Sequence, residues 1–118
     1  PKLFISSVDE KDMGNGYLAI TVTVGNERMI PTHSSHDIKN KITRPDYISI
    51  EGVEVVSGMR VLNIDRNETK EQVFEPKKLA VPNVPGLGSA TVRWIVKRKS
   101  NQNYSITVDS AKGGVIRQ

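Results

Sequence analysis

The chain contains no cysteine, and this absence removes several kinds of chemistry at once. It excludes disulfide bonds, a thiolate nucleophile, and zinc or iron–sulfur sites that use cysteine ligands. The sequence also lacks an apolar run of membrane-spanning length and a basic-then-apolar leader near Pro1. We therefore expect neither a membrane span nor a cysteine-based site.

Aromatic residues are scarce, at 5% of the chain, and Trp94 is the single tryptophan. The 118 residues are 36% hydrophobic and 25% charged, a balance typical of one folded globular domain and not of a disordered chain. The formal net charge of +4 permits weak attraction to anionic surfaces. Because the chain begins at Pro1 and enters the apolar residues 3–5 at once, we interpret 1–118 as one domain excised from the C-terminal part of a larger protein.

The strongest sequence pattern is alternation of apolar and polar residues, which buries one face of a β-strand. It is clearest at residues 18–24, 92–97 and 104–109 and weaker at 3–8, 47–51, 53–56, 60–64, 71–74 and 115–117. Seven to nine short strands of this kind predict an antiparallel β-sandwich of the immunoglobulin or fibronectin type III kind. The predicted core consists of Ile20, Val22, Val24, Ile48, Ile50, Val92, Trp94, Val96, Ile106 and Val108.

Turn residues separate the predicted strands. Gly14-Asn15-Gly16, Ser57-Gly58 and Asp65-Arg66-Asn67 are all typical of turns. Residues 75–88 contain three prolines, so we expect an extended surface connection there instead of a central strand. One short helical turn is predicted near residues 34–40, since Pro45 prevents the helix from continuing.

Three segments form an ordered set along the chain. The first is Val24–Thr32, in which Asn26, Pro31 and Thr32 match the pattern V-x-N-x-G-x-L-P-T. The second joins Arg44-Pro45 to residues 47–51 and 55–58, and the third comprises residues 92–96 and 109–115. Together they resemble a β-sandwich region found C-terminal to the catalytic domain in many bacterial zinc carboxypeptidase-like proteins. Arg28 departs from the pattern, because glycine usually stands there and a side chain disfavours positive φ.

This resemblance implies a non-catalytic accessory domain that braces, shields or tethers a catalytic domain, in a secreted or periplasmic bacterial protein. The family's catalytic His-x-x-Glu pair has no counterpart, since the chain contains only His33 and His36. We therefore expect no enzymatic activity and no cofactor in this chain. The expected partners are the catalytic domain of the parent protein and a protein or glycan surface.

Two clusters invite a metal hypothesis. His33, His36 and Asp37 lie close enough in sequence to share a site, but two or three adjacent ligands without a fourth favour a structural role. Asp9, Glu10 and Asp12 precede Asn15 without the spacing of a calcium loop. For this second cluster we predict a solvated turn between the first two strands.

Two alternative functions come from different classes. A carbohydrate- or cell-surface-binding module would use exposed aromatic residues, for which the candidates are Phe4, Tyr17, Tyr47 and Phe74. A nucleic-acid-binding domain would use a basic patch drawn from Lys77-Lys78, Arg93 and residues 97–99. The second alternative is disfavoured because alternation directs Trp94 into the core. In addition, charged residues at the ends of strands mostly serve to prevent edge-to-edge pairing with other chains.

Overall fold

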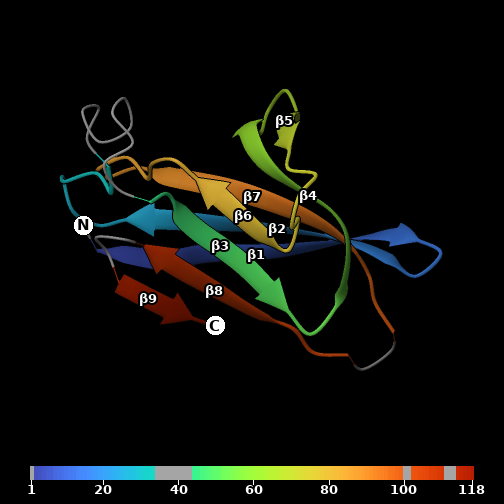
Figure 1. Ribbon diagram of the computed structural model, residues 1–118. Helices are drawn as coiled ribbons and strands as arrows, with labels where there is room; N and C mark the ends of the chain where they lie inside the picture. Colours follow the sequence, from blue (N-terminus) through green and yellow to red (C-terminus); the bar gives the residue numbers. More distant parts are fainter. Residues whose placement is uncertain (1, 34–43, 100–101, 111–113) are drawn as a thin grey trace.

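The computed structural model describes residues 2–33, 44–99, 102–110 and 114–118, and within these residues it contains strands and no helix (Figure 1). This confirms the predicted all-β class. The strands are β1 (Leu3–Gly14), β2 (Tyr17–Asn26), β3 (Asp46–Glu51), β4 (Glu54–Asn63), β5 (Glu68–Glu71), β6 (Lys78–Val81), β7 (Ser89–Lys97), β8 (Ser105–Ser110) and β9 (Gly114–Arg117). The predicted helical turn at 34–40 lies outside the described residues. No helix among the described ranges is long and apolar enough to cross a membrane.

The strands form two antiparallel sheets, which confirms the predicted β-sandwich. One sheet has the order β1-β2-β7-β4-β5, and the other has the order β6-β3-β8-β9. Strands 1, 2, 7 and 4 thereby repeat the A-B-E-D order of an immunoglobulin constant-type domain, and strands 3, 8 and 9 repeat its C-F-G order. Strands β5 and β6 are additions between positions D and E, and they lie at one edge of each sheet.

The core lies between the sheets and centres on Trp94. The ten residues expected in the core are each at most 2% exposed. In the five-stranded sheet, Ile20 pairs with Trp94 and Val22 with Val92, so the apolar faces of β2 and β7 coincide. Leu3, Leu79, Val81 and Val84 are also buried, and sequence analysis did not place them in the core.

The connection between β1 and β2 is shorter than predicted, because the acidic residues belong to a strand. Asp9, Glu10 and Asp12 all lie within β1, so the prediction of a solvated acidic turn is wrong. The turn itself is Asn15-Gly16, with φ of 58° and 84°. Positive φ at both residues matches the right-handed twist of the flanking strands, so β1 and β2 continue to the tip of a long hairpin.

Ser57-Gly58 is not a turn either, since β4 runs without a break from Glu54 to Asn63. Gly58 lies opposite Trp94 on β7, and a Cβ there would collide with the carbonyl oxygen of Pro76. The absence of a side chain lets residue 76 cross over the strand. Its carbonyl oxygen then accepts a hydrogen bond of 2.8 Å from the indole nitrogen of Trp94, which satisfies the one polar group of this buried side chain.

Residues 75–88 do more than cover the surface. Lys78–Val81 form the edge strand β6, and the side-chain amide of Gln72 lies along its outer edge. The Gln72 Oε1 accepts from the Ala80 N–H at 2.9 Å, and its Nε2 donates to the Lys78 carbonyl at 2.8 Å. Nε2 also donates to the carbonyls of Phe74 and Glu75, at 2.9 and 3.1 Å. One side chain therefore occupies two of the backbone groups on β6, the Lys78 carbonyl and the Ala80 N–H, that a further strand would need.

Candidate functional site

The segment that carries the family-like pattern is an internally bonded loop at one end of the sandwich. Asn26, the last residue of β2, is buried, and its Oδ1 accepts from the backbone N–H groups of Lys2 and Arg28, both at 3.1 Å. Its Nδ2 donates to the Ile30 carbonyl at 2.8 Å. Arg28 is not among the residues with positive φ, so this loop does not need the glycine of the pattern.

Thr32 holds the same loop to the segment before β7. It is fully buried, its backbone N–H donates to the Val84 carbonyl at 3.2 Å, and its Oγ1 accepts from the Val84 N–H at 2.8 Å. Its hydroxyl also lies 3.3 Å from Asn83 Oδ1. Pro31 lies between these anchored positions and is partly exposed. Asn26 and Thr32 thus fix the backbone of this loop and join it to Lys2 and to Val84.

His33 and Asp46 form a buried polar pair that sequence analysis did not connect. His33 Nε2 lies 3.2 Å from Asp46 Oδ1, and the two side chains are 3% and 1% exposed. The His33 backbone N–H donates to Asn83 Oδ1 at 3.0 Å. The other two metal candidates, His36 and Asp37, lie outside the described residues. Within those residues, no three His, Cys, Asp or Glu side chains group as metal ligands.

Glu10 of β1 belongs to a polar cluster at the opposite end of the sandwich. The Tyr104 hydroxyl donates to Glu10 Oε2, and Arg98 Nη1 lies 3.5 Å from Glu10 Oε1. Arg98 also lies 5.7 Å above the Tyr104 ring centroid. Burial, and then the hydrogen bond and charge of Glu10, raise the pKa of Tyr104 to about 12. This cluster fastens the β1–β2 hairpin to the chain before β8.

The basic residues proposed as a patch do not gather on one surface. Lys78 lies over the Tyr47 ring at 4.4 Å, and Arg98 belongs to the Glu10 cluster. Arg93 lies on β7 with its Nε donating to Thr21 Oγ1. The aromatic candidates are dispersed too, because Phe4 packs over Gly25 while Phe74 is 80% exposed.

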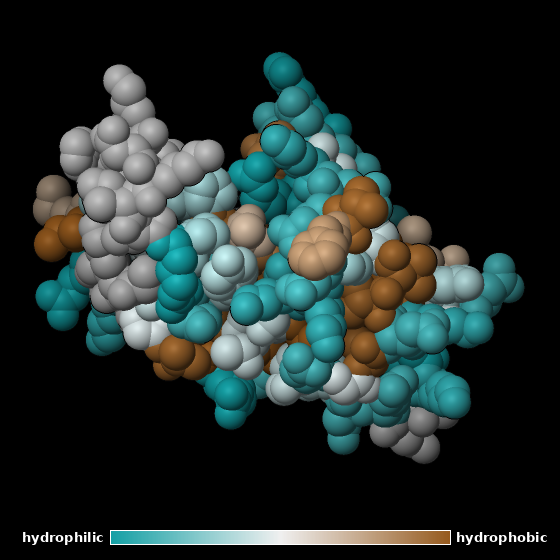
Figure 2. Space-filling model, viewed as in Figure 1, coloured by the Kyte–Doolittle hydropathy of each residue, from teal (hydrophilic) through white to brown (hydrophobic). Residues whose placement is uncertain are grey.

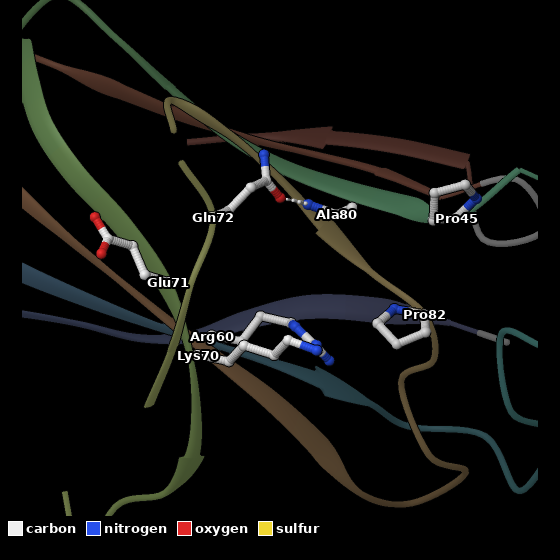
Figure 3. Close-up of a pocket in the computed structure, with 7 residues that line it drawn as sticks. All are labelled: Pro45, Arg60, Lys70, Glu71, Gln72, Ala80 and Pro82. Atoms are coloured by element: carbon white, nitrogen blue, oxygen red, sulfur yellow. Dashed lines mark hydrogen bonds between the residues drawn. The ribbon is translucent and has the colours of Figure 1, made fainter. Parts of the chain in front are cut away.

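A groove lies between the β4–β5 hairpin and β6, and sequence analysis missed it. Its first part has a volume of about 270 Å³ and is lined by Pro45, Arg60, Lys70, Glu71, Gln72, Ala80 and Pro82 (Figure 3). A second part of about 320 Å³ adjoins it, shares Arg60 and Pro82, and includes Leu62 and Val81. Figure 2 shows the β4–β5 hairpin as a hydrophilic projection above this side of the molecule. We call both parts together the cationic groove.

Arg60 and Lys70 give the cationic groove its charge. They are directly opposed on β4 and β5, and Arg60 also pairs with the inward-facing Val92. Both cations therefore lie on the inner face of the sheet, where β4 and β5 extend past the cover of the other sheet. In Figure 3 their side chains run parallel toward Pro82, while the Glu71 carboxylate points away, where it accepts from Ser57 at 3.0 Å. Neither cation has an ion pair within the described residues.

Comparison with known proteins gives a family. Residues 2–118 match the family described as a domain of unknown function, DUF8731. The chain belongs to this family. No curated protein and no solved structure matches it.

One signal in the sequence could have led to the cationic groove. Residues 65–67 are a turn, and strands that leave a turn pair at symmetric positions. Counting outward from that turn places Lys70 opposite Leu62, which makes it a diagonal neighbour of Arg60 on the same face. The register shift between Val61 and Asn63 then brings Arg60 and Lys70 directly opposite each other. The groove itself could not be found in this way, because its other wall comes from β6 and from Pro45.

Proposed function

We propose that this domain is a non-catalytic binding module, and that its cationic groove holds an extended acidic segment of a partner protein. The observation that carries the proposal is the like-charged pair Arg60–Lys70 on an inner sheet face. Like charges directly opposite in a sheet destabilise it. A carboxylate placed between the two cations would turn that repulsion into two favourable contacts.

The shape of the cationic groove favours a peptide chain as its occupant. Pro45 and Pro82 line one side with fixed backbone, so little conformational freedom is lost when a ligand binds. The adjoining part adds the apolar side chains of Leu62 and Val81 next to Arg60. A segment with alternating acidic and apolar side chains matches both features.

The groove does not favour strand addition to β6, because Gln72 already bonds to its outer edge. Recognition would therefore depend on side chains, and chiefly on the fork of Arg60, which can bind a carboxylate through two hydrogen bonds. An inward-pointing charge at a sheet edge can also serve only to discourage aggregation. The two roles differ in whether acidic peptides bind.

The resemblance to the accessory region of zinc carboxypeptidase-like proteins supports a narrower form of the proposal. In that form the module accompanies such a catalytic domain in a secreted or periplasmic bacterial protein, and the acidic segment belongs to that domain or to a surface partner. Asn26 and Thr32, the polar residues of the segment that carries the family-like pattern, would then keep the domain rigid and take no part in chemistry.

A second candidate function is binding to carbohydrate or to a cell surface. One observation favours it: Val73 and Phe74 are 83% and 80% exposed on the segment that leaves β5. Exposed aromatic rings provide flat apolar surface for a sugar. Nucleic-acid binding has less support, because the basic residues are dispersed.

Fluorescence anisotropy with a labelled peptide of alternating glutamate and leucine tests the proposal, and a glutamine-for-glutamate peptide is the ligand control. We expect the wild-type domain to bind the acidic peptide and the double variant Arg60→Gln/Lys70→Gln to bind at least about tenfold more weakly. The matched control is Lys97→Gln/Lys99→Gln, which removes the same charge from exposed positions at the far end of β7.

Three outcomes would contradict the proposal: no binding by the wild-type domain, equal weakening by both double variants, or equal affinity for the glutamine peptide. Glycan binding that is lost in Phe74→Ala and kept in Arg60→Gln/Lys70→Gln would favour the second candidate function.

A further inference from the structure

We infer that the outer face of the five-stranded sheet carries a second site, which binds a small compound with one carboxylate and a compact apolar part. A depression of about 410 Å³ lies on this face, and β1, β2, β7, β4 and the chain around β5 all contribute to its lining. The volume is within the range of small-molecule sites in proteins. The site shares no residue with the cationic groove and does not depend on the function proposed for it.

Arg93 is the central group of this depression, and its guanidinium is held in place from two sides. Its Nε donates to Thr21 Oγ1 at 2.9 Å, and its Nη1 donates to Asn67 Oδ1 at 2.7 Å. Both acceptors are neutral oxygens, so these hydrogen bonds orient the cation without neutralising its charge. The remaining N–H groups, including both on Nη2, make no hydrogen bond to the described residues and are available to a carboxylate.

Asn67 reaches Arg93 because of an unusual turn. It lies just before β5 with φ of 50°, a conformation that asparagine tolerates better than most residues. Its backbone N–H donates to the Ile64 carbonyl at 3.2 Å, which closes the turn. The turn therefore presents an amide oxygen to a guanidinium 26 residues further along the chain, and this fixes the fork before any ligand arrives.

The other lining residues define the rest of the ligand. Lys11 adds a second cation, while Met13, Met59 and Ile95 supply apolar surface. No carboxylate is among the lining residues that the structure describes. A carboxylate on Arg93 would thus have a short aliphatic or aromatic group beside it, in contact with flexible methionine side chains that adapt to its shape.

Two acidic residues at the borders argue against a larger anion. Asp9 is paired with Thr21, and Glu71 with Met59, so they lie two strands from Arg93 on either side. Their charges would repel a polyanion that extended across the sheet. A compound with a single negative group avoids both, and this distinguishes the site from a nucleic-acid surface.

The three methionines of the chain allow a direct test by methyl NMR, since Met13 and Met59 line the depression whereas Met29 lies on the Asn26 loop and is 80% exposed. The probe is hexanoate, and hexanamide is the uncharged control of the same shape. We expect hexanoate to shift the Met13 and Met59 methyl signals saturably, with a dissociation constant of about 1 mM. We expect no saturable shift of Met29 and none with hexanamide.

Variants then assign the effect to the guanidinium. We expect Arg93→Gln to abolish the saturable shift, Arg93→Lys to weaken binding about tenfold because the fork is lost, and Arg60→Gln to leave binding unchanged. The folded state of each variant is checked by the dispersion of its amide spectrum. The inference is overturned if hexanoate gives no saturable shift, if hexanamide acts equally, or if a folded Arg93→Gln binds as the wild type does.

Discussion

The loop end of this sandwich and its cationic groove use polar side chains in opposite ways. At the loop end, Asn26 and Thr32 bond to the backbone of neighbouring segments, and both are buried. In the groove, Arg60 on β4 lies directly opposite Lys70 on the neighbouring strand β5. Neither side chain forms an ion pair with another described residue. The first arrangement stabilises the fold, and the second costs stability and leaves charge available to a ligand.

The number of polar contacts alone therefore does not identify a binding site. The loop end has many contacts and matched the family-like pattern, but its side chains are used within the domain. The groove has few contacts, and its repulsion is small beside the total stability of a domain, which is about 5–15 kcal/mol. A fold can therefore retain such a pair where binding requires it.

Substitution of Asn26 at the loop end should give the largest change in stability. We expect Asn26→Ala to lower the free energy of unfolding by about 2 kcal/mol, because it leaves polar backbone groups of Lys2, Arg28 and Ile30 without their partner. Urea denaturation measures the change. The control is Ser6→Ala, which removes an exposed hydroxyl with one long bond of 3.3 Å and should change stability little. Equal effects from both variants would refute the assigned role.

Removal of the Tyr104–Glu10 hydrogen bond should change the free energy of unfolding by an intermediate amount, and this change should depend on pH. Because folding raises the pKa of Tyr104 from 10.0 to about 12, the folded state keeps the phenol proton more tightly than the unfolded state does. The stabilisation is complete below pH 10 and declines as the pH rises toward 12. We expect Tyr104→Phe to lose about 1 kcal/mol at neutral pH and to lack this decline.

Chemical denaturation between pH 8 and 12 measures the dependence, and tyrosinate absorbance measures the titration. Tyr17→Phe is the control, and it should keep the highest-pH step in the absorbance. A Tyr104→Phe variant that retains this step would contradict the assignment.

Substitution of Arg60 in the groove should give the smallest change in stability, and the change should be a gain. We expect Arg60→Gln to raise the free energy of unfolding by about 0.5 kcal/mol, since it removes the repulsion from Lys70. Lys97→Gln removes a charge that lies opposite Glu54 on β4 and should not stabilise the domain. The difference should shrink in 1 M salt, where surface charges are screened. A destabilised Arg60→Gln would mean that the arginine supports the fold.

The main features of the fold could be predicted because they depend on local alternation. In β2 and β7 every second residue is apolar, and their pairing buries Ile20, Val22 and Trp94 together. The prediction of a turn at Ser57-Gly58 was wrong because the glycine there allows residue 76 to cross closely over the strand. The prolines of residues 75–88 argued against a central strand, but β6 is an edge strand, and edge strands tolerate proline.

The candidate sites were harder to predict because each joins residues distant in sequence. His33 meets Asp46 across 13 positions, and Arg93 meets Asn67 across 26. Only tertiary structure brings these together, and no spacing rule of a single strand predicts them. The family-like pattern located Asn26 and Thr32, but their roles became clear from burial and bonding. The association with a zinc carboxypeptidase stays a prediction.

The side-chain amide of Gln72 protects the outer edge of β6 from pairing with other molecules. Its Nε2 is surrounded by three carbonyl oxygens at 2.8 to 3.1 Å. Deamidation would replace this donor with a carboxylate oxygen, which those carbonyls would repel. The outer side of β6 would then be exposed to strands of other molecules, so the ageing of one side chain would promote self-association.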